Sequence, residues 1–150
     1  MFADLILEIE KNIQHASKSA DTVSERGVDW HLHHTIKVLV SICIALKESK
    51  NKSYRPRFSW VKSFILVTGY IPRGRGKSPK AFNTCEKVSE EDLREMLEEA
   101  KYQLKSIEDL PPDRFFRHPY FGDFNLKQAR KFIKIHSWHH LKIVRDIVRE

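Results

Sequence analysis

The sequence predicts an all-α protein, a four-helix bundle with an extra short helix or an irregular basic segment. Leucine, isoleucine and valine recur at spacings of three and four residues in four long stretches, as one face of a helix requires. Good N-cap residues stand directly before three of these stretches. No set of partner strands is visible elsewhere in the chain. Long helices that each have an apolar face bury it most simply against one another, which gives a bundle.

The first two helices are expected at residues 2–15 and from residue 30 to about residue 48. Asp29 stands where the second helix begins, and its carboxylate suits an N-cap and the positive end of the helix dipole. The second helix is apolar nearly all round. A helix of that kind is expected in the middle of a bundle.

The two later helices carry clear start signals. Ser89 precedes three acidic residues, and the helix that follows is bounded by the Pro111–Pro112 pair. Asn125 with Gln128 three residues later is typical of a capping box, and the last helix is expected to run almost to the end of the chain.

The remaining segments are less regular. Residues 58–70 are aromatic and β-branched, and we expect a short helix there because no partner strand is visible. Residues 113–124 are expected to form an aromatic-rich loop. The Gly-x-Gly-Lys-Ser run at 74–78 lacks the full spacing of a phosphate-binding loop and is flanked by prolines, so we assign it no such role.

Composition indicates one ordinary globular domain over residues 1–150. The chain is 41% hydrophobic and 31% charged, which is not the composition of a disordered protein. No apolar run approaches the roughly 20 residues of a membrane-spanning helix, so no membrane partner is expected. The start of the sequence, Met1 to Asp4, lacks the basic residues of a secretory signal, and a cytoplasmic protein is expected.

The two cysteines do not indicate a disulfide or a thiolate metal site. Cys43 lies inside an apolar helical run, whereas Cys85 lies in a polar loop. Neither belongs to a C-x-x-C pair, which a thiolate zinc site usually contains.

The net charge of +7 comes from one segment. Residues 50–80 contain nine Lys or Arg residues and no acid, and the rest of the chain is nearly neutral. Such a segment can meet phosphates, although a solvated loop that keeps the protein soluble explains it more simply. Tyr54, Phe58 and Trp60 interleave with the basic residues, but they suit a core equally well.

Six of the eight histidines lie in two short windows, at 31–34 and 136–140. In the second window His136 and His140 step by four residues along the same stripe as Ile133 and Ile143, so the apolar residues carry both imidazoles inward. Two imidazoles at positions i and i+4 can chelate one metal ion.

The first window is expected to supply a third ligand. His34 is preferred because it lies deeper in its helix, while His31, one turn earlier, could replace it or hydrogen-bond nearby. His33 points about 100° away from His34. His139 is expected to support the ligands or face solvent, and His15 to interact with the end of the first helix. Three neutral histidines leave coordination positions open, as in a reactive metal site.

Three segments together resemble the DinB/YfiT-like superfamily of metalloenzymes. They are Trp30–His34, the His-Pro-Tyr-Phe-Gly run at 118–122, and His-Ser-Trp-His-His-Leu at 136–141. A branch of that superfamily carries a tryptophan–histidine segment in its second helix, an HPxFG loop and a terminal H-x-x-H-H-L helix. The similarity covers most of the chain.

The resemblance implies a four-helix bundle, often a homodimer, with His34, His136 and His140 as ligands of one divalent ion. Nickel or zinc is implied first, with iron or manganese as alternatives. Relatives include metal-dependent hydrolases and thiol-dependent S-transferases. The sequence departs from the pattern in its two extra histidines, His31 and His33, which leave the second-helix ligand less secure.

Two function classes follow. The first is a divalent-metal-dependent enzyme, of hydrolase or thiol-dependent S-transferase type, that acts on a small molecule. The alternative is a non-catalytic protein that uses the basic residues 50–80 to bind nucleic acid or another anion, with a structural metal or none. Nucleic acid ranks well behind the metal site, because the basicity is confined to one segment.

Overall fold

The structure is a computed structural model, and it describes residues 1–74 and 87–150. Cys85 and residues 75–78 of the glycine-rich run lie outside the described residues. The elements in chain order are α1 (Ala3–Ile13), α2 (Val28–Glu48), the 3-10 helix η1 (Asn51–Ser53), α3 (Trp60–Thr68), α4 (Glu90–Ser106), β1 (Phe115–His118), β2 (Gly122–Asn125) and α5 (Leu126–Arg149).

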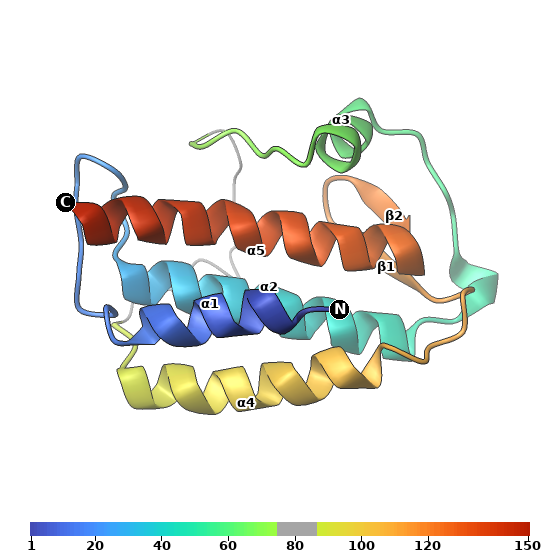
Figure 1. Ribbon diagram of the computed structural model, residues 1–150. Helices are drawn as coiled ribbons and strands as arrows, with labels where there is room; N and C mark the ends of the chain where they lie inside the picture. The colour runs from blue at the N-terminus through green and yellow to red at the C-terminus, as the bar shows by residue number, and fades with distance from the viewer. Residues whose placement is uncertain (75–86) are drawn as a thin grey trace.

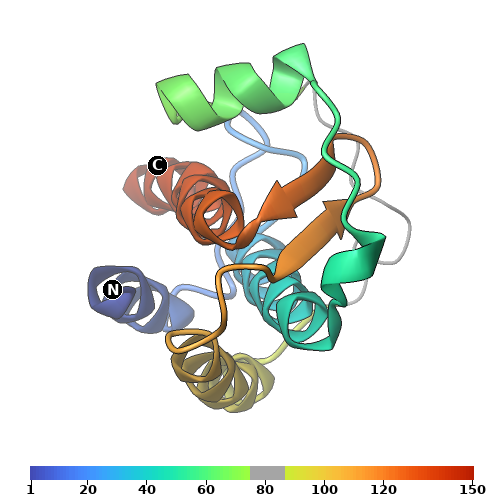
Figure 2. The ribbon, with the colours of Figure 1, turned by 90° about the vertical axis from the view of Figure 1, so that its right-hand side faces the viewer.

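Four long helices, α1, α2, α4 and α5, lie lengthwise beside one another around a shared core (Figures 1 and 2). Helix α2 contacts each of the other three, as its nearly uniform apolar surface predicts. Its residues Leu32, Ile36 and Leu39 are almost completely buried. The prediction of a mainly helical protein is therefore confirmed, although a small two-stranded sheet is added to it.

The predicted starts of α4 and α5 are confirmed in atomic detail. The Ser89 hydroxyl accepts a hydrogen bond from the backbone N–H of Asp92 at 3.0 Å. Asn125 Oδ1 accepts from the Gln128 N–H at 2.9 Å, and Gln128 Oε1 accepts from the Asn125 N–H at 3.1 Å. This reciprocal pair satisfies backbone donors that have no partner within the helix.

The prediction that Asp29 caps α2 is wrong. The N-cap is Gly27, and Asp29 lies in the first turn, where its Oδ2 accepts from the backbone N–H of Val88 at 3.3 Å. A Cβ on Gly27 would come within 2.8 Å of Asp29 Oδ1, so a residue without a side chain fits this start best. Asp29 thus joins the beginning of α2 to the segment before α4, a partner 59 residues away that local sequence does not reveal.

Residues 115–125 form a β-hairpin where a loop was expected. Strands β1 and β2 are antiparallel, with Phe115 opposite Asn125 and His118 opposite Gly122. Gly122 has φ +76°, the left-handed conformation that closes a three-residue hairpin loop and that glycine adopts without strain. The strands were not apparent in the sequence, because each is only four residues long and pairs with the next segment of the chain.

The short helix expected within residues 58–70 is confirmed as α3. Ser59 caps its start and Gly69, at φ +67°, ends it. Only its inner face is covered: Ile65 is buried, whereas Phe58 and Trp60 are 71% and 81% exposed. These two aromatic residues are therefore not core residues.

Within the part of the chain that the structure describes, none of the helices has both the length and the apolar character needed to cross a bilayer.

The capping box at the start of α5 gives a first prediction. Asn125→Ala leaves the Gln128 N–H without its acceptor, so the free energy of unfolding should fall by about 1 kcal/mol in urea denaturation. Lys127→Ala, in the same turn but exposed, is the matched control and should change stability far less. Equal losses in both variants would show that the cap contributes nothing specific.

Candidate metal centre

The histidines of α5 are carried inward by the apolar stripe of that helix. Ile133, Ile143 and Ile147 are buried along the side of α5 that faces the core. His140 lies on the same stripe and is 9% exposed, and His136, one turn earlier, is partly buried. The inward placement predicted from residue spacing is confirmed for both rings.

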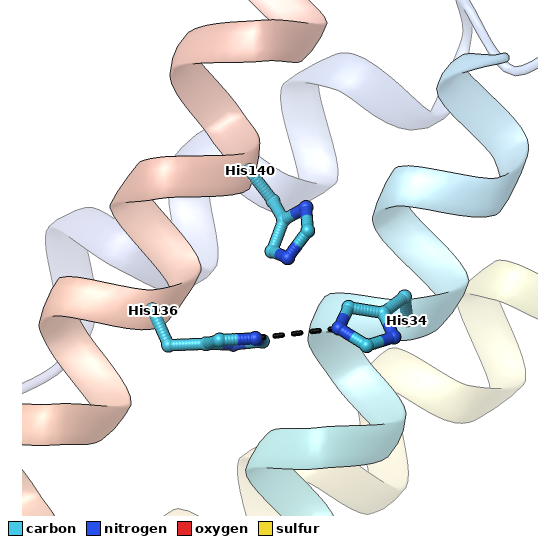
Figure 3. A group of neighbouring side chains, drawn as sticks. All are labelled: His34, His136 and His140. Atoms are coloured by element: carbon cyan, nitrogen blue, oxygen red, sulfur yellow. Dashed lines mark hydrogen bonds between the residues drawn. The ribbon is translucent and has the colours of Figure 1, made fainter. Parts of the chain in front are cut away.

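His34 meets them from α2 and is 4% exposed. Figure 3 shows its ring opposite that of His136, with the His140 ring beside the gap between the two helices. The Nε2 atoms of His34 and His136 are 3.3 Å apart. One ring nitrogen from each of the three residues lies within 4.8 Å of the other two.

These separations suit one metal ion. Two nitrogens bound at 2.0–2.1 Å in tetrahedral geometry lie about 3.3 Å apart. The His34–His136 pair already has this separation, and a small movement of the His140 ring would bring in the third nitrogen. No Asp, Glu or Cys among the described residues joins the group, so its donor set is all imidazole.

Burial keeps the rings neutral. Loss of solvent lowers the pKa of His136 and of His140 well below the usual histidine range, and neighbouring histidines lower it further. Each neutral ring keeps one N–H and one nitrogen with a free lone pair at neutral pH, and imidazole binds a metal in this neutral form.

Trp30 forms a wall of the cluster. Its ring stacks on that of His34, with centroids 4.8 Å apart and planes 8° from parallel. Its edge also approaches His31 and His140. The Trp30 Nε1–H is buried and has no hydrogen-bond partner in the described structure. The tryptophan of the first histidine window thus fixes the orientation of His34 by packing.

His31 lies behind His140 rather than among the three. The Nδ1 atoms of His31 and His140 are 3.0 Å apart, and His31 Nε2 is 3.0 Å from the Ser24 hydroxyl. Burial lowers the pKa of His31 to about 4. Of the two roles left open by the sequence, the geometry favours hydrogen bonding beside the site over replacement of His34.

A consistent proton arrangement follows for this chain of contacts. If His140 Nδ1 carries the proton and donates to His31 Nδ1, then His31 Nε2–H donates to Ser24, and His140 Nε2 retains its lone pair. Outer partners of this kind fix the tautomer of a metal-binding histidine. Sequence reasoning missed Ser24, which lies in a polar loop with no local signal.

The other histidines stand outside the group of three. His139 is partly buried beside His140, and burial lowers its pKa to about 4. His33, on α2, and His15, at the end of α1, are partly exposed. The buried Cys43 has a pKa raised by burial to about 12, so its thiol is a poor nucleophile.

The HPxFG motif forms the turn of the hairpin, and the His118 ring holds this turn in place. Its Nδ1 accepts hydrogen bonds from the backbone N–H groups of Tyr120 and Phe121, at 3.1 and 3.3 Å. The ring stacks on Phe121 and meets the edge of Phe132, which in turn lies against His136. The motif therefore shapes the hairpin and supports the cluster through Phe132.

Searches against protein families, curated proteins and solved structures find no significant match for this chain.

The His118 turn predicts a pH dependence of stability. Burial lowers the pKa of His118 to about 4, below its ordinary value of 6.5, so the folded state binds fewer protons than the unfolded chain between these values. The contribution of the neutral His118 ring to the free energy of unfolding is complete above pH 6.5 and is lost as the pH falls towards 4. His118→Asn keeps a hydrogen-bond acceptor but does not titrate in this range. In urea unfolding, its free energy of unfolding should therefore fall less between pH 6.5 and pH 4 than that of the wild type.

Gln14→Asn, at an exposed position without a titratable group, is the control and should follow the wild type through the same range. Parallel curves for the wild type and His118→Asn would contradict the assignment of this proton to His118.

Proposed function

We propose that the protein is a divalent-metal-dependent enzyme whose ion is held by His34, His136 and His140. The observation that carries the proposal is the meeting of one ring nitrogen from each of three histidines within 4.8 Å between two helices, where burial keeps His136 and His140 neutral. The resemblance to the DinB/YfiT-like superfamily favours nickel or zinc, both of which imidazole ligands suit, and iron and manganese are the further candidates.

The donor set fits a reactive centre better than a structural one. Structural zinc sites are closed by four protein ligands, whereas catalytic sites keep three and leave a position open. A divalent ion in such a site supplies Lewis acidity, which lowers the pKa of a water molecule or a thiol and polarises an electrophile. The reactions proposed for such a centre are hydrolysis and thiol-dependent group transfer.

The chain's own residues then have distinct tasks. His31 and Ser24 hold the tautomer of His140, and Trp30 holds the plane of His34. Phe132 packs against the ring of His136. Each of these contacts pre-orients a nitrogen and thereby lowers the reorganisation that ion binding requires.

Membership of the DinB/YfiT-like superfamily, with its bundle and frequent homodimer, belongs to the same proposal. Its support is the arrangement of four long helices and the convergence of two of the three motif segments on one cluster, with the third packed next to it. Light scattering in solution tests the homodimer separately from the metal.

Metal analysis of the purified protein tests the site. The wild type should hold about one divalent ion per chain, and His136→Ala and His140→Ala should each lose most of it, because removal of one of three ligands costs a large part of the affinity. His15→Ala is the control and should retain the metal of the wild type.

Unchanged metal content in both α5 variants, or a wild type that takes up no ion, would overturn the proposal.

The linkage of ion binding to folding gives a second, independent prediction. At a free ion concentration about 100 times the Kd, a ligand that binds only the folded state raises the free energy of unfolding by about 2.7 kcal/mol. Titration of nickel or zinc into chelator-treated protein should therefore raise the thermal midpoint. His140→Ala should show little of this rise, and an equal rise in that variant would locate the ion elsewhere.

A further inference from the structure

A second candidate site lies outside the histidine cluster, where the segment before α3 passes over the β-hairpin. The hollow between them has a volume of about 490 Å³, within the range of small-molecule sites. Figures 1 and 2 both show this segment beside the hairpin. The hollow has Arg55, Arg57 and Arg117 among its walls, together with Phe58 and Tyr120.

The frame of the hollow is fixed by a buried carboxylate. Asp123 is 2% exposed, and it accepts from the backbone N–H of Arg55 at 2.7 Å and from the Arg117 guanidinium at 2.7 and 3.0 Å. The buried ammonium of Lys62 donates to the backbone carbonyls of Arg57 and Asp123, at 3.1 and 3.0 Å. These bonds tie the segment to the hairpin, so the walls are formed before any ligand arrives.

The charge of the walls is not balanced. Three arginines line the hollow, and the carboxylate of Asp123 compensates one of them, Arg117, which leaves an excess of two positive charges among the lining residues. The Arg55 guanidinium donates to the carbonyls of Lys52 and Tyr54, and that of Arg117 pairs with Asp123. The Arg57 guanidinium makes no hydrogen bond or ion pair with any residue that the structure describes.

An excess of two positive charges matches a phosphate monoester, which carries a charge of about −1.5 to −2 at neutral pH. A single carboxylate or a phosphodiester supplies only one negative charge. Guanidinium groups also offer the paired donors that phosphate oxygens accept.

The aromatic rings indicate the rest of the ligand. Phe58 is 71% exposed and Tyr120 is 61% exposed, although both border the hollow. Trp60 meets Phe58 edge to face, with centroids 4.8 Å apart, and is 81% exposed. Exposed aromatic rings beside cationic side chains are typical of sites that stack a planar base next to its phosphate.

We propose that this hollow binds a phosphate monoester that carries a planar ring, the chemistry of a mononucleotide. The phosphate lies at Arg57, and the ring lies against Phe58 or Tyr120. His118 also lines the hollow, and its contact with Phe132 brings the hollow to within two ring contacts of His136. The proposal does not depend on a metal.

Calorimetric titration of the full chain, in the presence of a chelator, tests the site with three probes. Adenosine 5′-monophosphate should bind about tenfold more tightly than adenosine or glycerol phosphate, because each of these lacks one half of the recognised chemistry. Arg57→Gln should weaken adenosine monophosphate about tenfold and leave adenosine unchanged. The double variant Tyr120→Ala and Phe58→Ala should weaken the binding of adenosine monophosphate but leave the binding of glycerol phosphate unchanged.

Arg94→Gln is the matched control, since Arg94 is an exposed arginine on α4 that forms an ion pair with Glu90 at 3.7 Å, and its loss changes the net charge equally. It should bind adenosine monophosphate like the wild type. Thermal melts establish that each variant is folded. Arg57→Gln should remain folded, because the Arg57 carbonyl still accepts the hydrogen bond from Lys62.

The proposal is overturned if the wild type does not bind adenosine monophosphate at millimolar concentration, or if Arg57→Gln binds it as the wild type does. Tighter binding of a single-stranded oligonucleotide than of the mononucleotide would also overturn it, in favour of a nucleic-acid surface. Since the metal content is measured separately and the chelator is present throughout, failure here leaves the metal centre untouched.

Discussion

The contact between α2 and α5 depends on imidazole rings that cannot be charged where they lie. His34 and His140 are nearly inaccessible to water, and His31 is buried behind them. Protonation of His31 or His140 would place a buried cation beside other histidines, and burial lowers the pKa of both, so these two rings are held neutral. The same burial that stabilises the helix pair thus prepares nitrogen lone pairs for an ion.

A buried charge, the carboxylate of Asp123, organises the other side of the hairpin. Asp123 is stabilised by Arg117 and by a backbone N–H, which lower its pKa, and this network anchors the chain before α3. The two arrangements meet through the rings of His118 and Phe132. The hairpin is therefore the element that connects the histidine cluster to the cationic hollow.

The helices were predictable because their signals are local. Capping by Ser89 and Asn125 and the spacing of apolar residues require only neighbours within a few positions, and the structure confirms them. The hairpin and the role of Asp29 were not predictable in this way. The strands are too short to show a clear alternation, and the partner of Asp29 is the backbone of Val88, far along the chain. The exposure of Trp60 also depends on which face of α3 finds a neighbour, and that of Phe58 on the path of the chain just before this helix.

The sequence by itself determined that His136 and His140 point the same way, because a helix brings residues four apart onto one face whatever surrounds it. It also favoured His34 as their partner and left the place of His31 open. Only the tertiary structure decided that the two helices pack at a register that brings three nitrogens together and puts His31 against Ser24. The contacts of His31 with His140 and of His34 with His136 join residues more than a hundred positions apart, and their geometry is set by the packing of the whole core rather than by any local rule.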